Sequence, residues 1–370
     1  MLKYIYQHTR WPKFTWDNSL VLPLLLNVRN QQGRLKGYMD FLGFVLRDET
    51  TLGTLTLDVL KSSEIEGEVL NPEQVRSSIA KHLGMDVGGL IPTDRNVDGV
   101  VEMMLDATQN YKKPLTKKRL YNWHASLFPT GRSGMRKIQV GKWRDNKKGP
   151  MQVVSGAMGK ERVHFEAPNA NRLEKDMTLF LKWFNTNKTI DAVLKSAIAH
   201  FWFVTIHPFD DGNGRIARAI ADMQLAVSDN STQRFYSMSA QIRVQRKGYY
   251  EVLEKMQHSN LDVTHWMVWY LKCLQSALNE TDKTLKRVLT KSKFWDKHTL
   301  TPINERQRLI INKLFDSFDG KLNSSKWAKI TKCSADTALR DINDLIRKNI
   351  LLRDEAGGRS TSYNLNETNF

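Results

Sequence analysis

Residues 207–218 read HPFDDGNGRIAR and bring an imidazole, a carboxylate, a glycine-rich turn and two guanidiniums into twelve positions. His207 is neutral near pH 7 unless its surroundings perturb it, so it can accept a proton from an attacking hydroxyl. Asp211 offers the hard oxygen that Mg²⁺ or Mn²⁺ prefers, with substrate phosphates as further ligands. Together these groups suit the attack of a hydroxyl on a phosphorus atom.

The glycines and arginines of the same stretch predict a phosphate site. Helix-favouring residues precede it at 192–206 and follow it at 216–227, so we expect a tight loop that opens a second helix. Arg215 and Arg218 are three positions apart on that helix and point to one side, where guanidiniums match phosphate oxygens. Backbone amides at the start of the helix can form an anion nest. The residues of this nest are Gly212, Asn213 and Gly214.

This stretch resembles the signature of Fic-domain proteins, HPFx(D/E)GNGRxxR, at every fixed position. Members of that family typically transfer AMP from ATP to a hydroxyl side chain of a target protein and release pyrophosphate. The resemblance implies that His207 is the general base and that Asp211 holds the metal. It also implies that the 212–214 turn binds anions, with Arg215 and Arg218 on the β- and γ-phosphates. Relatives of the death-on-curing toxin type carry a lysine at position 214 and act as kinases, so Gly214 favours adenylyl transfer.

A second motif lies upstream, where residues 61–68 read KSSEIEGE. Ser62, Glu66 and Gly67 resemble the family's inhibitory motif, (S/T)xxxE(G/N), and the motif's position before the signature is typical of the N-terminally inhibited class. Ser62 and Glu66 are four residues apart, so they share one face of a helix. Glu66 would pair with Arg218 and occupy the guanidinium that the γ-phosphate needs. Some similar proteins also use this glutamate to remove AMP. The alternative is an ordinary helix end, with Gly67 as its cap.

Residues 131–168 are glycine-rich and contain the β-prone pieces KIQVGKW, MQVVSG and RVHFEAP, which predict a hairpin-like excursion. By resemblance, the segment 148–154 with Gln152 and Val153 is the flap that aligns a target's acceptor residue by strand pairing. An ordinary surface hairpin is the alternative. The family also places a side chain near the adenine on the helix expected at 243–256. Tyr250 is our preferred residue there, although a core role remains open for it.

Helical periodicity dominates the rest of the chain, which predicts a mainly α fold with a Fic-type helical core, a β-hairpin flap and a C-terminal winged helix-turn-helix. We expect three parts: an N-terminal helical region with the inhibitory helix (1–112), a Fic-like catalytic domain (113–285) and a winged-helix domain (286–370). The helices of the first two parts are expected at 19–47, 50–64, 72–82, 96–111, 117–128, 173–185 and 247–280.

The winged-helix assignment rests on three expected helices followed by two short strands about a Gly-Gly turn. Ser334 is the expected N-cap of the third helix, SADTALRDINDLIRKN. Residues 286–370 hold 17 Lys and Arg against 10 Asp and Glu, and in a DNA-binding reading Arg340, Arg347 and Lys348 would contact phosphates. The same helix carries Asp336, Asp341 and Asp344, which favours protein interaction or dimerisation instead. A homodimer therefore stays open.

The whole chain of 370 residues has a net charge of +17, which favours anionic partners. Its two cysteines, Cys273 and Cys333, are far apart and indicate a reducing, cytoplasmic compartment. We find no signal peptide or membrane span. The sequence thus predicts a protein adenylyltransferase that uses ATP and Mg²⁺ or Mn²⁺ on Ser, Thr or Tyr hydroxyls of a target protein or of itself, inhibited by Glu66. The alternative function is a nucleotide-sensing, DNA-binding transcriptional regulator.

Overall fold

The computed structural model describes residues 3–41, 44–85, 89–147, 149–156, 160, 162–315, 318, 320–354, 361–366 and 368. The chain divides into two compact units, Met1–Thr281 and Asp282–Phe370. The boundary falls within the long helix α11 (Thr264–Lys297), so the polar stretch after residue 280, where a domain boundary was expected, is helical.

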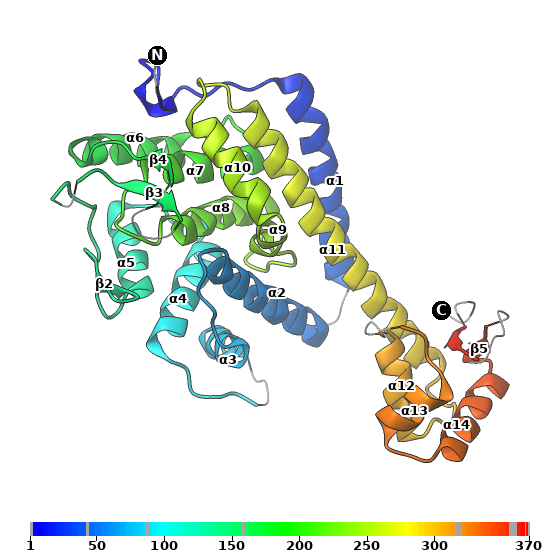
Figure 1. Ribbon diagram of the computed structural model, residues 1–370. Helices are drawn as coiled ribbons and strands as arrows, with labels where there is room; N and C mark the ends of the chain where they lie inside the picture. The colour runs from blue at the N-terminus through cyan, green and yellow to red at the C-terminus, as the bar shows by residue number, and fades with distance from the viewer. Residues whose placement is uncertain are drawn as a thin grey trace. The chain divides into compact units, whose positions relative to one another are not determined.

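The first unit is built mainly of helices (Figure 1). Their bounds are α1 (Asn18–Phe41), α2 (Phe44–Ile65), α3 (Pro72–Leu83), α4 (Arg95–Gln109), α5 (Lys117–Leu127), α6 (Leu173–Thr186), α7 (Ala192–Ile206), α8 (Asn213–Asp229), α9 (Met238–Val244) and α10 (Arg246–Gln257), with short 3-10 turns at Ile5–Gln7 and Ala170–Arg172. Most of the expected helices are present. Three of the expected bounds were wrong: α1 ends at Phe41 rather than at residue 47, α2 begins at Phe44 rather than near residue 50, and the helix expected at 247–280 is split into α10 and α11.

The centre of this unit is α7, whose residues are buried from Val193 to Ile206. A helix that is apolar on all sides has to lie inside a bundle, because no face of it can meet water at low cost. α8 packs against α7, and the two lie together in the middle of the unit (Figure 1). The loop between them carries HPFDDG, so the most deeply packed pair of helices holds the candidate site.

The helix α2 is fixed to the rest of the unit by a buried carboxylate. Asp58 accepts hydrogen bonds from the Ser237 hydroxyl at 2.5 Å and from the Ser239 backbone amide at 3.1 Å, at the start of α9. A buried carboxylate is costly unless such donors satisfy it. These bonds therefore set the position of the whole helix, including its C-terminal end with the SSEIEG motif.

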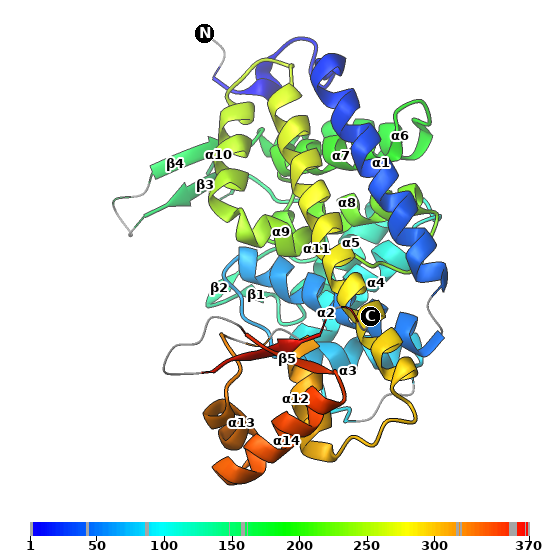
Figure 2. The same cartoon turned by 90° about the vertical axis from the view of Figure 1, so that its right-hand side faces the viewer.

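Two antiparallel hairpins interrupt the helices of this unit. β1 (Arg132–Ser133) pairs with β2 (Arg136–Lys137), and β3 (Gln152–Ser155) pairs with β4 (Arg162–Glu166). Figure 2 shows β3 and β4 beside α10. The β-prone piece KIQVGKW was expected to be a strand, but only its first residue is in one. Lys148, at the start of the expected flap segment, lies outside the described residues.

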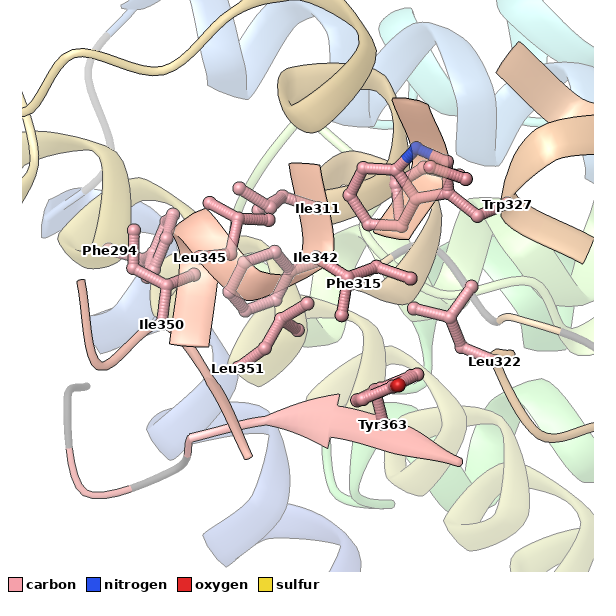
Figure 3. Close-up of a cluster of buried hydrophobic side chains, with 12 residues drawn as sticks. Phe294, Ile311, Phe315, Leu322, Trp327, Ile342, Leu345, Ile350, Leu351 and Tyr363 are labelled. Atoms are coloured by element: carbon pink, nitrogen blue, oxygen red, sulfur yellow. The ribbon is translucent and has the colours of Figure 1, made fainter. Parts of the chain in front are cut away.

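The second unit contains α12 (Glu305–Phe315), α13 (Ser324–Thr331), α14 (Ala335–Arg347) and the antiparallel strands β5 (Leu351–Arg353) and β6 (Tyr363–Leu365). Its own core is a cluster of buried side chains with Phe315 and Ile342 in the middle and the fully buried Trp327 at one edge (Figure 3). Ser334 caps α14 by accepting from the Thr337 amide. The expected Gly-Gly turn lies outside the described residues, and the winged-helix assignment stays a prediction.

Candidate functional site

The loop between α7 and α8 is held in shape by its own asparagine. The Asn213 side chain accepts from the Phe209 amide at 3.0 Å and donates to the Phe209 carbonyl at 2.8 Å. Phe209 is fully buried and stacks on His124, with ring centroids 4.2 Å apart. The side chain of Asn213 therefore shapes the loop from inside, whereas the sequence interpretation placed Asn213 in the lining of the phosphate site.

His207 ends α7 in the left-handed conformation, with φ of 52°. Its Nδ1 lies 3.3 Å from the Val204 carbonyl, so Nδ1 carries the proton and Nε2 is the acceptor. Burial, and then the positive charge of Arg144, lower the pKa of His207 to about 4. The ring is therefore neutral near pH 7, as a general base has to be.

Arg144 is a residue that the sequence interpretation missed. It is buried, and its Nε donates to the His207 carbonyl at 2.7 Å while its backbone amide donates to the Pro208 carbonyl at 2.9 Å. These bonds fix the backbone on which the imidazole is mounted. A lone arginine in a loop some sixty residues upstream carries no sequence signal of such a role.

Asp211 presents an oriented carboxylate. One oxygen accepts from the Gly212 amide at 2.6 Å, and the other accepts from the hydroxyl of Ser133 in β1. Its neighbour Asp210 instead accepts from the Gln139 amide. Among the residues that the structure describes, no three acidic, histidine or cysteine side chains form a metal cluster. A single carboxylate fits Mg²⁺, which typically takes one or two protein carboxylates and completes its shell with phosphates and water.

The Glu66 carboxylate lies against Gly214, one residue of the predicted anion nest. A Cβ placed on Gly214 would lie 2.2 Å from Oε1 of Glu66, so the carboxylate rests directly on the backbone of the nest. The same oxygen pairs with Nη2 of Arg218 at 2.8 Å. Ser62 completes the contact, since its hydroxyl and its carbonyl accept from Arg218 at 2.9 and 2.8 Å. The structure thus brings all the residues of this predicted contact together.

The other predicted phosphate arginine is also occupied. Arg215 pairs with Glu68 at 2.5 Å, and its guanidinium lies 5.0 Å from the centroid of the Phe128 ring. Gly67, with φ of 86°, caps α2 and turns the chain back, so that the amides of Gly67 and Glu68 return to the Glu64 and Ser63 carbonyls. Glu66 and Glu68 therefore flank one glycine and contact one arginine each. The sequence interpretation missed Glu68, because the inhibitory pattern ends at Gly67. The acidic residue directly after the capping glycine was the signal that could have predicted this second contact.

A cavity of about 960 Å³ opens beside these groups. The predicted site residues on its wall are Glu66, Val153, His207, Gly214 and Tyr250. Gln152, the other predicted flap residue, instead bonds across the hairpin to Glu166 at 2.9 Å.

The two adjacent tyrosines of α10 have different surroundings. Tyr249 is 2% exposed and its hydroxyl lies 2.9 Å from Nε2 of His200. Tyr250 is half-buried, and Arg246 lies over its ring with the guanidinium 5.2 Å from the centroid. Arg246 also donates to the Ile65 carbonyl at 2.8 Å. The more exposed ring, that of Tyr250, is thus the one the sequence interpretation preferred.

Two family models match the chain. Residues 114–225 match the Fic/DOC family, and residues 4–85 match a domain of unknown function, DUF4172. The chain is 33% identical over 110 residues to a probable protein adenylyltransferase of Aquifex aeolicus, which covers 28% of this chain and 32% of the relative. It is 28% identical over 171 residues to the protein adenylyltransferase Fic of Drosophila melanogaster, covering 45% and 31%. The chain thus spans about a third of the length of these relatives.

Two solved structures have a similar fold. One is a Fic family protein from Desulfovibrio desulfuricans G20, with a TM-score of 0.54 and 21% identity over 96% of this chain and 98% of that one. The other is a Fic domain containing signaling protein from Bacteroides thetaiotaomicron, with a TM-score of 0.52 and 19% identity over 70% and 98%. Residues 114–225 therefore match a Fic/DOC domain, and the mainly helical fold of the chain is similar to that of these two structures. No helix in the described ranges is long and apolar enough to cross a membrane.

Proposed function

We propose that the chain transfers AMP from ATP to a Ser, Thr or Tyr hydroxyl of a target protein and is held inactive at rest by Glu66. The observation that carries this proposal is the place of the Glu66 carboxylate. It rests on the Gly214 backbone and pairs with Arg218, which is 2% exposed. A carboxylate that lies beside a glycine at a helix N-terminus and pairs with a guanidinium marks the position of an anionic substrate group.

Each residue of the site has its own role in the proposed reaction. Nε2 of the neutral His207 takes the proton of the incoming hydroxyl. The α8 N-terminus and the two arginines hold the phosphates and take up the charge of the departing pyrophosphate. Asp211 would hold Mg²⁺ or Mn²⁺, and the ion would supply positive charge to offset that of the phosphates. The flap hairpin with Val153 would align the acceptor by backbone pairing. With Glu66 positioning a water, the same site would also remove AMP.

The test is AMP incorporation from α-labelled ATP into the proteins of a cell lysate. On lysate proteins other than the chain itself, we expect little label with the wild-type chain, strong label with Glu66→Gly, and none above background with Glu66→Gly combined with His207→Ala. Glu64→Gln is the matched control, because Glu64 lies two residues before Glu66, at the end of α2, but pairs with Lys61 and Arg243. Absence of labelled protein with Glu66→Gly would contradict the proposal.

The second candidate function, a nucleotide-sensing DNA-binding regulator, gains support from α14. Asp341 accepts from Asn304 and Arg306, and Asp344 pairs with Lys348 and Arg347. Two of the three acids that opposed DNA binding are therefore neutralised within the unit, while Arg340 is exposed. Two of the predicted phosphate contacts, Arg347 and Lys348, are engaged by the same Asp344. Salt-dependent retention on DNA without any AMP transfer would favour this candidate.

A further inference from the structure

A second group of reactive side chains lies on the wall of the same cavity. The Ser155 hydroxyl of β3 lies 2.6 Å from Nε2 of His164 in β4, and Nδ1 of His164 lies 2.7 Å from Oε2 of Glu254 in α10. All three residues line the cavity that contains His207 and Gly214. A hydroxyl, an imidazole and a carboxylate in this order form the arrangement that activates a serine oxygen.

The strand register explains how His164 reaches both partners. Val153 pairs with Phe165, whereas the next residue, Val154, pairs with Val163, so His164 is an extra residue in β4. Such a bulge turns a side chain out of the regular alternation. The ring is then fixed from both sides, since the ionised carboxylate of Glu254 accepts the proton on Nδ1. Nε2 is thereby left as the acceptor for the Ser155 hydroxyl.

A purely structural role, in which Ser155, His164 and Glu254 hold the hairpin against α10, explains only some of their contacts. The hairpin is tied to α10 by Arg162, which pairs with Oε1 of Glu254 at 2.8 Å, and by the bond from His164 to the other oxygen. His258 adds a third tie through the His164 carbonyl at 2.9 Å. The bond to Ser155 stays within the hairpin and ties it to nothing else. Its chemical effect is to draw the hydroxyl proton toward an imidazole, on an exposed serine that faces the cavity.

We propose that Ser155 is an acceptor of AMP in the chain's own transfer reaction, within one molecule. This inference rests on the proposed function, which supplies ATP as the electrophile. The Ser155 oxygen attacks the α-phosphorus, a new O–P bond forms, and the bond from that phosphorus to the bridging oxygen of pyrophosphate breaks. The hydroxyl proton passes to Nε2 of His164, and pyrophosphate leaves with the bonding electron pair. Glu254 is a positioning residue that orients the ring and stabilises its protonated form.

AMP attached to Ser155 would obstruct the same cavity in which the transfer takes place. Ser155 ends the strand that begins with Gln152 and Val153, so AMP on its oxygen stands in the cavity beside the predicted target strand. A modified flap and a target protein then compete for one space. Self-modification at Ser155 therefore limits transfer to targets once Glu66 has been displaced.

The experiment is peptide mapping by mass spectrometry of the purified full chain carrying Glu66→Gly, after incubation with ATP and Mg²⁺. We expect one AMP on Ser155, at a rate per chain that does not change when the protein is diluted. Ser155→Ala removes this label, whereas Ser276→Ala, a serine of α11 bonded to the Lys272 carbonyl, does not. His164→Ala slows labelling by about 100-fold, the size of a general-base contribution, and imidazole added to the solution restores part of it.

The Glu254 variants separate positioning from simple support of the fold. Glu254→Gln keeps a polar contact but not the charge, so it slows Ser155 labelling by about tenfold, and Glu254→Asp recovers part of the rate. If lysate proteins are labelled but Ser155 is not, this inference is overturned and the proposed function stands. Ser155 labelling that rises with chain concentration, or that His164→Ala leaves unchanged, also overturns it. No labelled protein in either assay overturns the proposed function as well.

Discussion

The two arginines at the start of α8 are held by the same turn of chain in different surroundings. Arg218 is 2% exposed and meets Glu66, with Ser62 closing the contact. Arg215 is 6% exposed, and the two partners differ little, since Glu66 is 32% and Glu68 is 40% exposed. The number of bonds separates the two contacts: Arg218 also donates to the hydroxyl and the carbonyl of Ser62, whereas Arg215 pairs with Glu68. An ion pair within a hydrogen-bond network is more strongly coupled than an isolated pair. The contact at Arg218 is thus the stronger of the two that would hold the proposed site inactive.

The largest effect is expected for Glu66→Gln, which keeps the shape of the side chain but not its charge. Loss of this charge leaves the buried guanidinium of Arg218 uncompensated, at a cost on the order of 3 kcal/mol, so AMP incorporation at subsaturating ATP should rise by about 100-fold. The measurement is the initial rate of label transfer to lysate proteins. A rise no larger than that of Glu68→Gln would show that the bonds from Arg218 to Ser62 do not separate the two contacts.

Glu68→Gln should raise the same rate by only about fivefold, because Glu68 is 40% exposed and its pair with Arg215 is worth about 1 kcal/mol or less. At high salt the Arg215–Glu68 pair of the wild-type chain is already screened. The difference in rate between the variant and the wild-type chain should therefore be smaller at high salt. A salt-independent rise would place Glu68 in a far less hydrated contact than its exposure indicates.

Gly67→Ala should have the smallest effect on the rate of AMP incorporation, although Gly67 lies between Glu66 and Glu68 and so affects both ion pairs. Its backbone has φ of 86°, a conformation that costs a residue with a Cβ about 1 kcal/mol. The end of α2 should loosen, Tm should fall by a few degrees, and the rate should rise about twofold. Thermal unfolding and the labelling assay measure the two effects. Gly84→Ala, at the αL cap of α3, is the control that should lower Tm without raising the rate.

Part of the site could be predicted from local pattern. The helical periodicity before and after residues 207–218 correctly indicated the helices α7 and α8. The spacing of Ser62 and Glu66 predicted one helix face; in the structure α2 ends at Ile65 and Glu66 lies in the turn after it, yet both residues contact Arg218. The helices follow from residues within a turn or two of one another, whereas the contact with Arg218 joins distant segments.

Long-range contacts had no comparable signal. Arg144 reaches the His207 carbonyl, Ser133 reaches Asp211, and Glu254 reaches His164, each from a different element. Such pairs depend on how the hairpins and α10 pack, and a single serine or arginine in a loop is compatible with many positions. The break between α10 and α11 was likewise missed, since both helices continue one periodic pattern.

The sequence by itself determined the chemistry available here: a histidine, a carboxylate, a glycine turn and two arginines at fixed spacing, and an upstream glutamate of matching charge. These are properties of residue type and of short-range backbone geometry. Only the tertiary structure decided which of those groups are occupied and how strongly. The bonds to Ser62 separate the contact at Arg218 from the one at Arg215, and a bulge in β4 joins Ser155 to His164 and Glu254. Such bonds and the strand register arise from packing between distant segments, which no local pattern records.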